Sequence, residues 1–353
     1  MIQLKDNEIY RAELAKVSLA CPDMTMLGGH SVLVTGATGL IVSAIVDLLS
    51  FLNETLDLKI RIYAAGRKIE KLTVRFDEPT HFLNYVEYDA DRGLRFDQPV
   101  DYIIHAASNA QPGLYVSQPV ETMVANFCGV RDLLEFAKNN QVKRVLYVSS
   151  SEVYGQKQEI GAFGENDYGH IDITNVRSSY AMSKRASETL CRAYWHEYHI
   201  DTVMVRPGHI YGPTAPTGDN RVVAQFAEMA SRGEDLVMKS KGLQLRSYCH
   251  SLDCASAILM VLLKGASGES YNISNKHSVI TIRQMAEMLA EKSQVSLRFD
   301  CPTSEEQMAF NPMNNSSLNA EKLESLGWVG CMDAESGLGE YVEILKEVAG
   351  RKV

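Results

Sequence analysis

The chain has 353 residues, and its 35 lysines and arginines against 44 aspartates and glutamates give a formal net charge of −9. At about 150 residues per domain, this length predicts two domains, or one large α/β domain with an elaborated end. The acidic balance argues against nucleic acid or an anionic membrane as the main partner. A phosphate-bearing small ligand is still compatible with it, because such a ligand needs only a local basic spot.

Cysteine usage and the amino-terminal segment both predict a cytoplasmic protein. The seven cysteines are odd in number and scattered, and none forms a C-x-x-C pair, which favours a reducing compartment and argues against a structural zinc site. The segment 1–27 carries charges throughout and lacks the apolar core of a signal peptide. No run of 18 apolar residues occurs, so the sequence predicts no membrane span. It also offers no residues that we assign as metal ligands.

Short apolar runs rich in β-branched residues alternate along the chain with longer helical patterns. Strand-like runs occupy 31–35, 59–64, 85–88, 102–106, 142–149, 202–206 and 271–273, and helix-like stretches occupy 40–51, 120–139, 179–198, 222–232 and 252–263. Such alternation, with strands that are apolar throughout, predicts an α/β fold with a doubly wound parallel sheet of the Rossmann type. The segment before this pattern predicts an additional helix near 9–19.

A glycine-rich turn, GATGLI over 36–41, joins the first predicted strand to the first predicted helix of the sheet. Glycines let the backbone approach a pyrophosphate closely, and the free N–H groups at a helix N-terminus attract its charge. Val42 stands where a third glycine would allow close helix–strand packing, so the turn departs from the full dinucleotide fingerprint. The simpler interpretation is a plain strand–helix turn.

The end of the second strand bears on the choice between NAD and NADP. An acidic residue at this place usually binds the adenosine ribose, whereas this chain offers Arg67 and Lys68. A basic pair accepts a 2′-phosphate, so both cofactors stay open; the alternative is a solvated basic turn. Asp89, after the third strand, is a candidate contact for the adenine, or a turn residue.

Tyr180 and Lys184 lie at i and i+4, which places them on one face of the predicted helix over 179–198. A phenol is a poor base at neutral pH, and a neighbouring ammonium makes its phenolate accessible as a proton acceptor from an alcohol. Upstream, the strand over 142–149 runs into three serines at 149–151. Ligands of open α/β sheets bind at the carboxyl ends of the strands, so a serine there can hydrogen-bond the same alcohol.

With these residues the chain resembles the extended short-chain dehydrogenase/reductases, specifically the NAD(P)-dependent nucleotide-sugar epimerases and dehydratases. The resemblance runs from about residue 31 to the C-terminus and rests on TGATGLI (35–41), DYIIHAAS (101–108), RVLYVSSSEVYG (144–155), YAMSK (180–184), RPGHIYGP (206–213), RSYCHSLD (246–253), GESYNIS (268–274) and LGW (326–328). It implies an NAD(P)-binding Rossmann domain over 31–207 with parts of 250–275. A smaller substrate-binding lobe is expected over 208–250 and 276–353, after an N-terminal extension over 1–30.

The resemblance also implies roles for individual residues. Tyr180 is expected to be the acid/base, Lys184 to hold the nicotinamide ribose and tune Tyr180, and Ser150 to orient the sugar hydroxyl. The expected cofactor-binding residues are Gly36, Thr38, Gly39, Leu40, Ile41, Arg67, Asp89, Ala106, Ala107, Ser108, Asn126 and Pro207, together with Tyr180 and Lys184. The expected substrate-binding residues are Ser151, His209, Arg221 and Arg246. The two arginines could instead form surface ion pairs, and His209 stands where the family usually has asparagine.

Glu152 bears on which reaction is implied. Oxidation of the sugar at C4 gives a 4-ketone, which acidifies the C5 proton for elimination of a C6 group and makes a C6 carboxylate a β-keto acid that loses carbon dioxide. Glu152 resembles the glutamate of dehydratases and decarboxylases; its simpler interpretation is a loop carboxylate bonded to backbone. Ser151 stands where many glucose-type dehydratases have aspartate. We therefore predict a 4-keto-forming lyase, a 4,6-dehydratase or a decarboxylase, with a nucleotide-sugar 4-epimerase as the alternative.

Two further classes stay open at this point. A nucleotide-sugar reductase would need exchangeable NADPH, which Arg67 and Lys68 allow, and a noncatalytic binding protein would tolerate loss of the serine, tyrosine and lysine that this chain keeps. The expected partner is a nucleoside-diphosphate sugar. Because family members usually dimerise through two long helices, the resemblance also implies a homodimer through 120–139 and 179–198.

Overall fold

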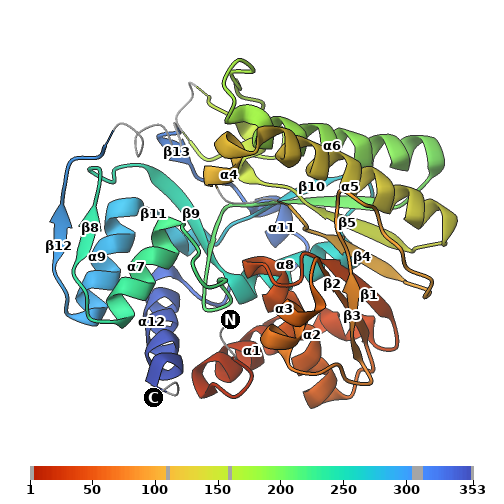
Figure 1. Cartoon of the computed structure of the whole chain (residues 1–353), viewed down its shortest axis with the longest axis horizontal. Coiled ribbons are helices and arrows are strands. Elements are labelled where there is room, and N and C mark those ends of the chain that lie inside the picture. Colours follow the sequence, from red (N-terminus) through yellow and green to blue (C-terminus); the bar gives the residue numbers. More distant parts are fainter. Residues whose placement is uncertain (1–3, 109–111, 158–160, 304–312, 351–353) are drawn as a thin grey trace.

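The large sheet of the protein is parallel and has helices on both faces, as Figure 1 shows for the computed structural model. The structure describes residues 4–108, 112–157, 161–303 and 313–350. Seven strands follow the order β10-β6-β5-β4-β1-β2-β3, and every neighbouring pair is parallel. The order reverses next to β1, and the crevice at such a reversal is where open α/β sheets bind ligands. The predicted Rossmann-type fold is confirmed.

The elements of the large sheet lie close to the predicted ranges. Its strands are β1 (Ser31–Thr35), β2 (Arg61–Gly66), β3 (Leu83–Glu87), β4 (Tyr102–His105), β5 (Arg144–Val148), β6 (Thr202–Pro207) and β10 (Ser270–Ile273). Its helices are α2 (Leu40–Leu56), α3 (Ile69–Phe76), α4 (Pro112–Ser117), α5 (Pro119–Asn139), α6 (Ser178–Tyr198) and α8 (Ser251–Lys264), with the 3₁₀ turn η2 (Ser151–Tyr154). The sequence did not predict α3, because that helix is short and buries only Leu72 and Arg75.

Side chains of successive strand residues point alternately to two hydrophobic cores, one on each face of the large sheet. In β1, Val32 and Val34 pack with α2 and α8, whereas Leu33 packs with α5 and α6. The central strands are therefore apolar at every position, which is the pattern of a sheet that helices cover on both faces. This alternation fixes the register of the strands, because a slip of one residue would exchange the two faces.

A smaller lobe stands at one end of the large sheet, at the left of Figure 1. Its strands are β7 (His209–Tyr211), β8 (Leu236–Met238), β9 (Leu245–His250), β11 (Val279–Thr281), β12 (Leu297–Phe299) and β13 (Asn315–Ser316). Its helical elements are α7 (Val222–Ser231), η3 (Lys276–Ser278), α9 (Ile282–Ser293) and α12 (Ala334–Gly350), whereas the short helix α11 (Glu321–Glu324) packs against β10 of the large sheet. Helices α7, α9 and α12 share one hydrophobic core with β8 and β9. The proposed domain boundaries stay a prediction.

The first segment of the chain forms α1 (Glu8–Ala20) and the 3₁₀ turn η1 (Pro22–Leu27), which matches the helix predicted near 9–19. The Asn7 side chain caps α1 by accepting a hydrogen bond of 2.9 Å from the Tyr10 N–H. One face of α1 buries Tyr10, Leu14 and Val17 in the core that it shares with α2 and α8. This segment is thus part of the folded body, where it closes the outer side of two sheet helices.

A buried ion pair ties α6 to the large sheet below the carboxyl edge. Arg206 on β6 and Glu188 on α6 are 5% and 6% exposed, and their side chains are joined at 2.6 Å. Arg206 also donates to the Tyr154 hydroxyl at 2.9 Å and to the Glu165 carbonyl at 2.8 Å. Arg206 thus bonds to Tyr154 of η2 and to Glu188 of α6 at the same time, so the network holds η2 and α6 together. Within the described ranges, no helix has the length and apolarity that crossing a membrane requires.

Candidate active site

The glycine turn has the geometry that a bound pyrophosphate requires. Gly36 has φ +76°, and a Cβ there would lie 3.0 Å from Ala107 Cα, so only glycine fits. Helix α2 begins directly after Gly39, whose N-cap position offers no side-chain cap, and Leu40 and Ile41 form the first turn. The unpaired N–H groups and the positive end of the helix dipole face the sheet edge, where a phosphate would bind.

The loop after β4 runs beside this turn. The Thr35 hydroxyl accepts hydrogen bonds from the N–H groups of Ala106 and Ala107 at 3.2 and 3.3 Å, and it lies 2.7 Å from His105 Nδ1. Burial lowers the pKa of His105 to about 3, so the imidazole is neutral. The Ser108 hydroxyl is buried and has no partner within the described residues. This unpaired group and the two alanines follow β4 and lie beside the glycine turn.

Helix α5 and the end of β6 complete the floor of this region. Asn126 is 1% exposed and donates to the Ser183 hydroxyl at 2.9 Å, while its own amide oxygen has no partner among the described residues. Pro207 ends β6 at the same edge of the sheet. Val42, at the position of the missing third glycine, is 3% exposed and packs in the core below α2. The helix therefore accommodates a valine here within the packed interior.

The residues expected near the adenosine lie around the ends of β2 and β3. Arg67 and Lys68 follow the last residue of β2 and are both exposed. Asp89 follows β3, is half-buried, and accepts a hydrogen bond of 3.3 Å from the Asp91 N–H within a turn. Thr38 lies in the glycine turn itself and is half-buried. The roles of these four residues stay predictions.

Tyr180 lies near the start of α6, with Ser150 opposite it at the start of η2. Burial and the charge of Glu152 raise the pKa of Tyr180 to about 12, against an opposite effect of the Ser150 side chain. Lys184, one turn along α6, is 2% exposed and donates to the Val148 carbonyl at 2.8 Å. Burial lowers the pKa of Lys184 to about 7. The structure thus brings the predicted serine, tyrosine and lysine together.

Glu152 does not bond to backbone as its simpler interpretation required, because a side-chain partner holds its carboxylate. Arg177, next to the start of α6, donates to both carboxylate oxygens, at 3.0 and 3.1 Å. Both side chains are largely buried, at 18% and 14% exposure. A bidentate pair of this kind is stronger and more directional than a single ionic contact. The next residue of η2 toward the N-terminus, Ser151, is 6% exposed.

The small lobe contributes two arginines and a histidine to the same centre. Arg221, the N-cap of α7, forms an ion pair with the buried Asp219, and its charge lowers the pKa of Tyr180. Arg246 on β9 is 3% exposed, and within the described residues no carboxylate forms an ion pair with it. The alternative of simple surface ion pairs does not apply to either arginine. Arg221 pairs with a buried carboxylate, and Arg246 is itself buried.

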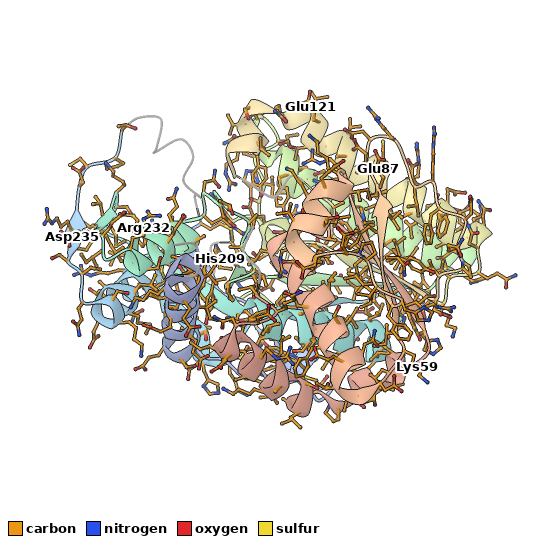
Figure 2. All side chains as sticks on the ribbon, turned by 60° about the horizontal axis from the view of Figure 1, so that its bottom comes forward. Lys59, Glu87, Glu121, His209, Arg232 and Asp235 are labelled. Carbon is orange, nitrogen blue, oxygen red and sulfur yellow. The ribbon has the colours of Figure 1, made fainter. Side chains whose placement is uncertain are left out.

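His209, on β7, lies beside these arginines. Burial and the charges of Arg246 and Arg221 lower its pKa to about 3, so the ring is neutral, and its Nδ1 atom is buried with no partner among the described residues. In the view of Figure 2, His209 lies between the labelled Arg232 of the small lobe and Lys59, which precedes β2 of the large sheet. It therefore stands where the two lobes meet. The part of the chain that the structure describes holds no cluster of three or more potential metal ligands.

Two residues of this centre have no role in the sequence-based prediction. Arg177 lies three residues before Tyr180, and Tyr115 is on the short helix α4. The Tyr115 ring stacks on Tyr180 with ring centroids 4.2 Å apart and an angle of 7° between the planes. No spacing rule links either residue to its partner, because 64 residues separate Tyr115 from Ser179, which it contacts. Only the arrangement of α4, η2 and α6 brings them together.

A glycine turn at a helix N-terminus and a tyrosine–lysine helix at one sheet edge define the short-chain dehydrogenase/reductase class. The chain belongs to the NAD dependent epimerase/dehydratase family, whose model matches residues 32–274. It is 26% identical over 225 residues to mouse dTDP-D-glucose 4,6-dehydratase, a match that covers 63% of this chain and 61% of that protein. It is 31% identical to UDP-glucuronic acid decarboxylase 5 of Arabidopsis thaliana, with 62% of each chain covered.

A solved structure shows the same fold over nearly the whole chain. UDP-glucose 4-epimerase from Thermotoga maritima, crystallised with UDP-glucose, superposes with a TM-score of 0.75 at 23% identity and covers 90% of this chain and 99% of its own. The chain spans only about three fifths of the length of these two curated relatives. By their names these three proteins carry out dehydration, decarboxylation and epimerisation. Membership of the family therefore does not by itself decide which of these reactions a chain carries out.

Proposed function

We propose that the protein is an NAD(P)-dependent enzyme that oxidises a nucleoside-diphosphate sugar at C4 and then removes the C6 carboxylate as carbon dioxide. Within the predicted group of 4-keto-forming lyases, the pairing of Glu152 with Arg177 favours decarboxylation over elimination. The similarity to a UDP-glucuronic acid decarboxylase at 31% identity supports the same reaction.

The residues at the sheet edge fit a dinucleotide. The turn at Gly36 leaves no room for a Cβ, the first turn of α2 offers free N–H groups, and the buried Ser108 hydroxyl is unpaired among the described residues. These groups would hold the pyrophosphate and contact the rest of the dinucleotide, and Arg67 would meet the ribose or a 2′-phosphate. When bound, the nicotinamide supplies hydride chemistry at C4 of the sugar.

Tyr180 is the proposed acceptor of the proton from the C4 hydroxyl. Ser150 lies close enough to Tyr180 to lower its pKa, so both would contact one sugar hydroxyl at the same time. With a pKa near 12, Tyr180 is protonated at neutral pH in the protein alone, so little phenolate is present to accept a proton. A positively charged nicotinamide beside the ring would favour the phenolate, since an opposite charge within a few ångströms lowers a phenol pKa.

The Glu152–Arg177 pair is the observation that carries the choice of reaction. Elimination from C5 and C6 needs a carboxylate that is free to take the C5 proton. In this chain both oxygens of that carboxylate already accept hydrogen bonds from the guanidinium, which fixes its direction and leaves neither oxygen free for a C5 proton. A 4-keto sugar with a C6 carboxylate requires no such base, because the ketone itself accepts the electron pair that the departing carbon dioxide leaves behind.

The cationic groups of the site suit an anionic substrate in a chain of net charge −9. Arg246 has no carboxylate partner within the described residues and would meet the diphosphate. Arg221 forms an ion pair with Asp219, and its charge is close enough to Tyr180 to lower the pKa of that residue. This position would place Arg221 near the sugar. The unpaired Nδ1 of the neutral His209 would accept or donate one hydrogen bond to the same ligand.

The test is to incubate the purified protein with NAD or NADP and with UDP- and dTDP-linked hexoses and hexuronates, and to measure product mass. We expect loss of carbon dioxide from a hexuronate and no product from neutral hexoses. Loss of water would establish a dehydratase, and unchanged mass with altered chromatography a 4-epimerase; either result would contradict the proposal. Tyr180→Phe should abolish turnover, whereas Tyr63→Phe, in a half-buried ring that packs on Phe96, should not.

We further propose that the protein is a cytoplasmic homodimer. The exposed faces of α4 and α5 share large apolar side chains, namely Val116, Val120, Met123, Val124 and Phe127. Such a continuous patch is unusual on a monomer and fits a self-complementary interface of two helices from each protomer. The seven cysteines are all free thiols, which supports a reducing compartment.

A further inference from the structure

Tyr115 is held against the proposed acid/base by its ring. It lies on α4, is 3% exposed, and stacks on Tyr180 at a centroid distance of 4.2 Å with nearly parallel planes. Aromatic pairs at this separation stabilise each other beyond the area that they bury, and they restrict rotation of both rings. The stack therefore limits where the Tyr180 hydroxyl can point.

Two residues just before Tyr180 also contact Tyr115, one at its backbone carbonyl and one at its ring. The Ser179 hydroxyl, one residue before Tyr180, donates to the Tyr115 carbonyl at 3.2 Å. The guanidinium carbon of Arg177 lies 5.7 Å from the centroid of the Tyr115 ring, within the range of a cation–π contact. Since Arg177 also holds Glu152, one aromatic ring contacts both the acid/base tyrosine and the arginine of the ion pair.

The hydroxyl of Tyr115 adds an electrostatic contact. The Tyr115 side chain lies against the Tyr180 ring and lowers the pKa of the Tyr180 hydroxyl. The other groups that act on Tyr180 are Ser150 at the start of η2 and Arg221 at the start of α7, which lower its pKa, and Glu152 of η2, which raises it.

Lys184, on the same helix as Tyr180, has its amine 5.7 Å from the Tyr180 ring centroid and bonded to a carbonyl. Tyr115 thus favours the phenolate in the unliganded protein, together with Ser150 and Arg221.

We propose that Tyr115 is a positioning residue of the acid–base centre, which holds the Tyr180 ring by stacking and stabilises the Tyr180 phenolate by donating a hydrogen bond to its oxygen. This role rests on the proposed function, in which Tyr180 accepts the proton of the C4 hydroxyl. During proton transfer, the C4 hydroxyl of the sugar loses its proton to the Tyr180 oxygen while the O–H bond of Tyr115 stays intact. Tyr115 thus takes no proton in the cycle and makes the phenolate state available at lower pH.

Two variants separate the hydroxyl from the ring. Tyr115→Phe keeps the stack and removes the hydrogen bond, so the acidic limb of the kcat/KM profile should move about one pH unit upward, with an activity loss of about tenfold below that limb. Tyr115→Leu removes the ring as well and should lower kcat further at every pH. Tyr63→Phe is the matched control and should leave the profile unchanged. An unshifted limb in Tyr115→Phe would overturn the proposal.

A second readout does not depend on turnover. In protein labelled with fluorotyrosine, the fluorine resonance of Tyr180 is identified by its absence in Tyr180→Phe. The ring current of Tyr115 should displace this resonance, and the displacement should persist in Tyr115→Phe and disappear in Tyr115→Leu. If the resonance is the same in all Tyr115 variants, the stack does not exist and the proposal fails. If no nucleotide sugar reacts but the displacement is found, the proposed function fails while the contact stands.

Discussion

Glu13, in the N-terminal helix α1, makes the free energy of unfolding depend on pH in a way that can be measured. This carboxyl group is 3% exposed, and its Oε1 atom lies 3.7 Å from Nε2 of the fully buried His250. Burial, together with the neighbouring carboxylates of Glu340 and Asp253, raises the pKa of Glu13 to about 9, against a small opposite effect of Lys16. Glu13 is therefore protonated in the folded protein at neutral pH. Burial also lowers the pKa of His250 to about 3, so that ring is neutral.

The cost of this buried acid follows from linkage. Folded and unfolded chains bind the same number of protons at Glu13 below its ordinary pKa and above about 9, and between these values the folded chain binds one more. Stability due to this group is therefore full at low pH and falls as pH rises through that window, by about 1.4 kcal/mol per unit. At pH 7 the loss amounts to about 3 kcal/mol, because the ordinary pKa is 4.5.

Glu13→Gln removes this cost while it keeps the shape of the side chain. We expect the variant to be more stable than wild type by between about 1 and 3 kcal/mol at pH 7, and by less than about 1 kcal/mol at pH 5. Urea unfolding at a series of pH values between these limits measures the difference. Glu8→Gln, on the exposed face of the same helix, should change stability by less than about 1 kcal/mol. A stability difference that does not grow with pH would refute the reasoning.

Three further predictions follow from the fold and the interface. Gly36→Ala should lower the melting temperature and prevent cofactor retention, because the methyl group would meet Ala107 at 3.0 Å and alanine disfavours φ +76°; retained cofactor in the purified variant would contradict this. Arg206→Met should cost about 3–5 kcal/mol in urea unfolding by leaving Glu188 buried without its partner, and the added change Glu188→Leu should recover much of the loss. Phe127→Arg should convert a dimer into a monomer in light scattering, and a persistent dimer would rule out the α5 face as the interface.

Most of the large sheet was predictable because its signals are local. Strands that helices cover on both faces must be apolar at successive positions, and the helices between them repeat apolar residues every three or four positions. The glycine turn at 36–39 and the Tyr180–Lys184 spacing are likewise contained in a few consecutive residues. The strands β8, β12 and β13 have two or three residues each and were not predicted, because segments so short carry no periodicity of their own.

By itself, the sequence determined the fold class, the cofactor turn and the serine, tyrosine and lysine of the centre. It also suggested Glu152, but not the state of that residue. Only the tertiary structure brought Arg177 onto both of its oxygens and Tyr115 onto the ring of Tyr180. The physical reason is that these contacts join α4, η2 and α6 across loops. Their geometry depends on how the helices pack, and no repeat or spacing in the chain encodes it.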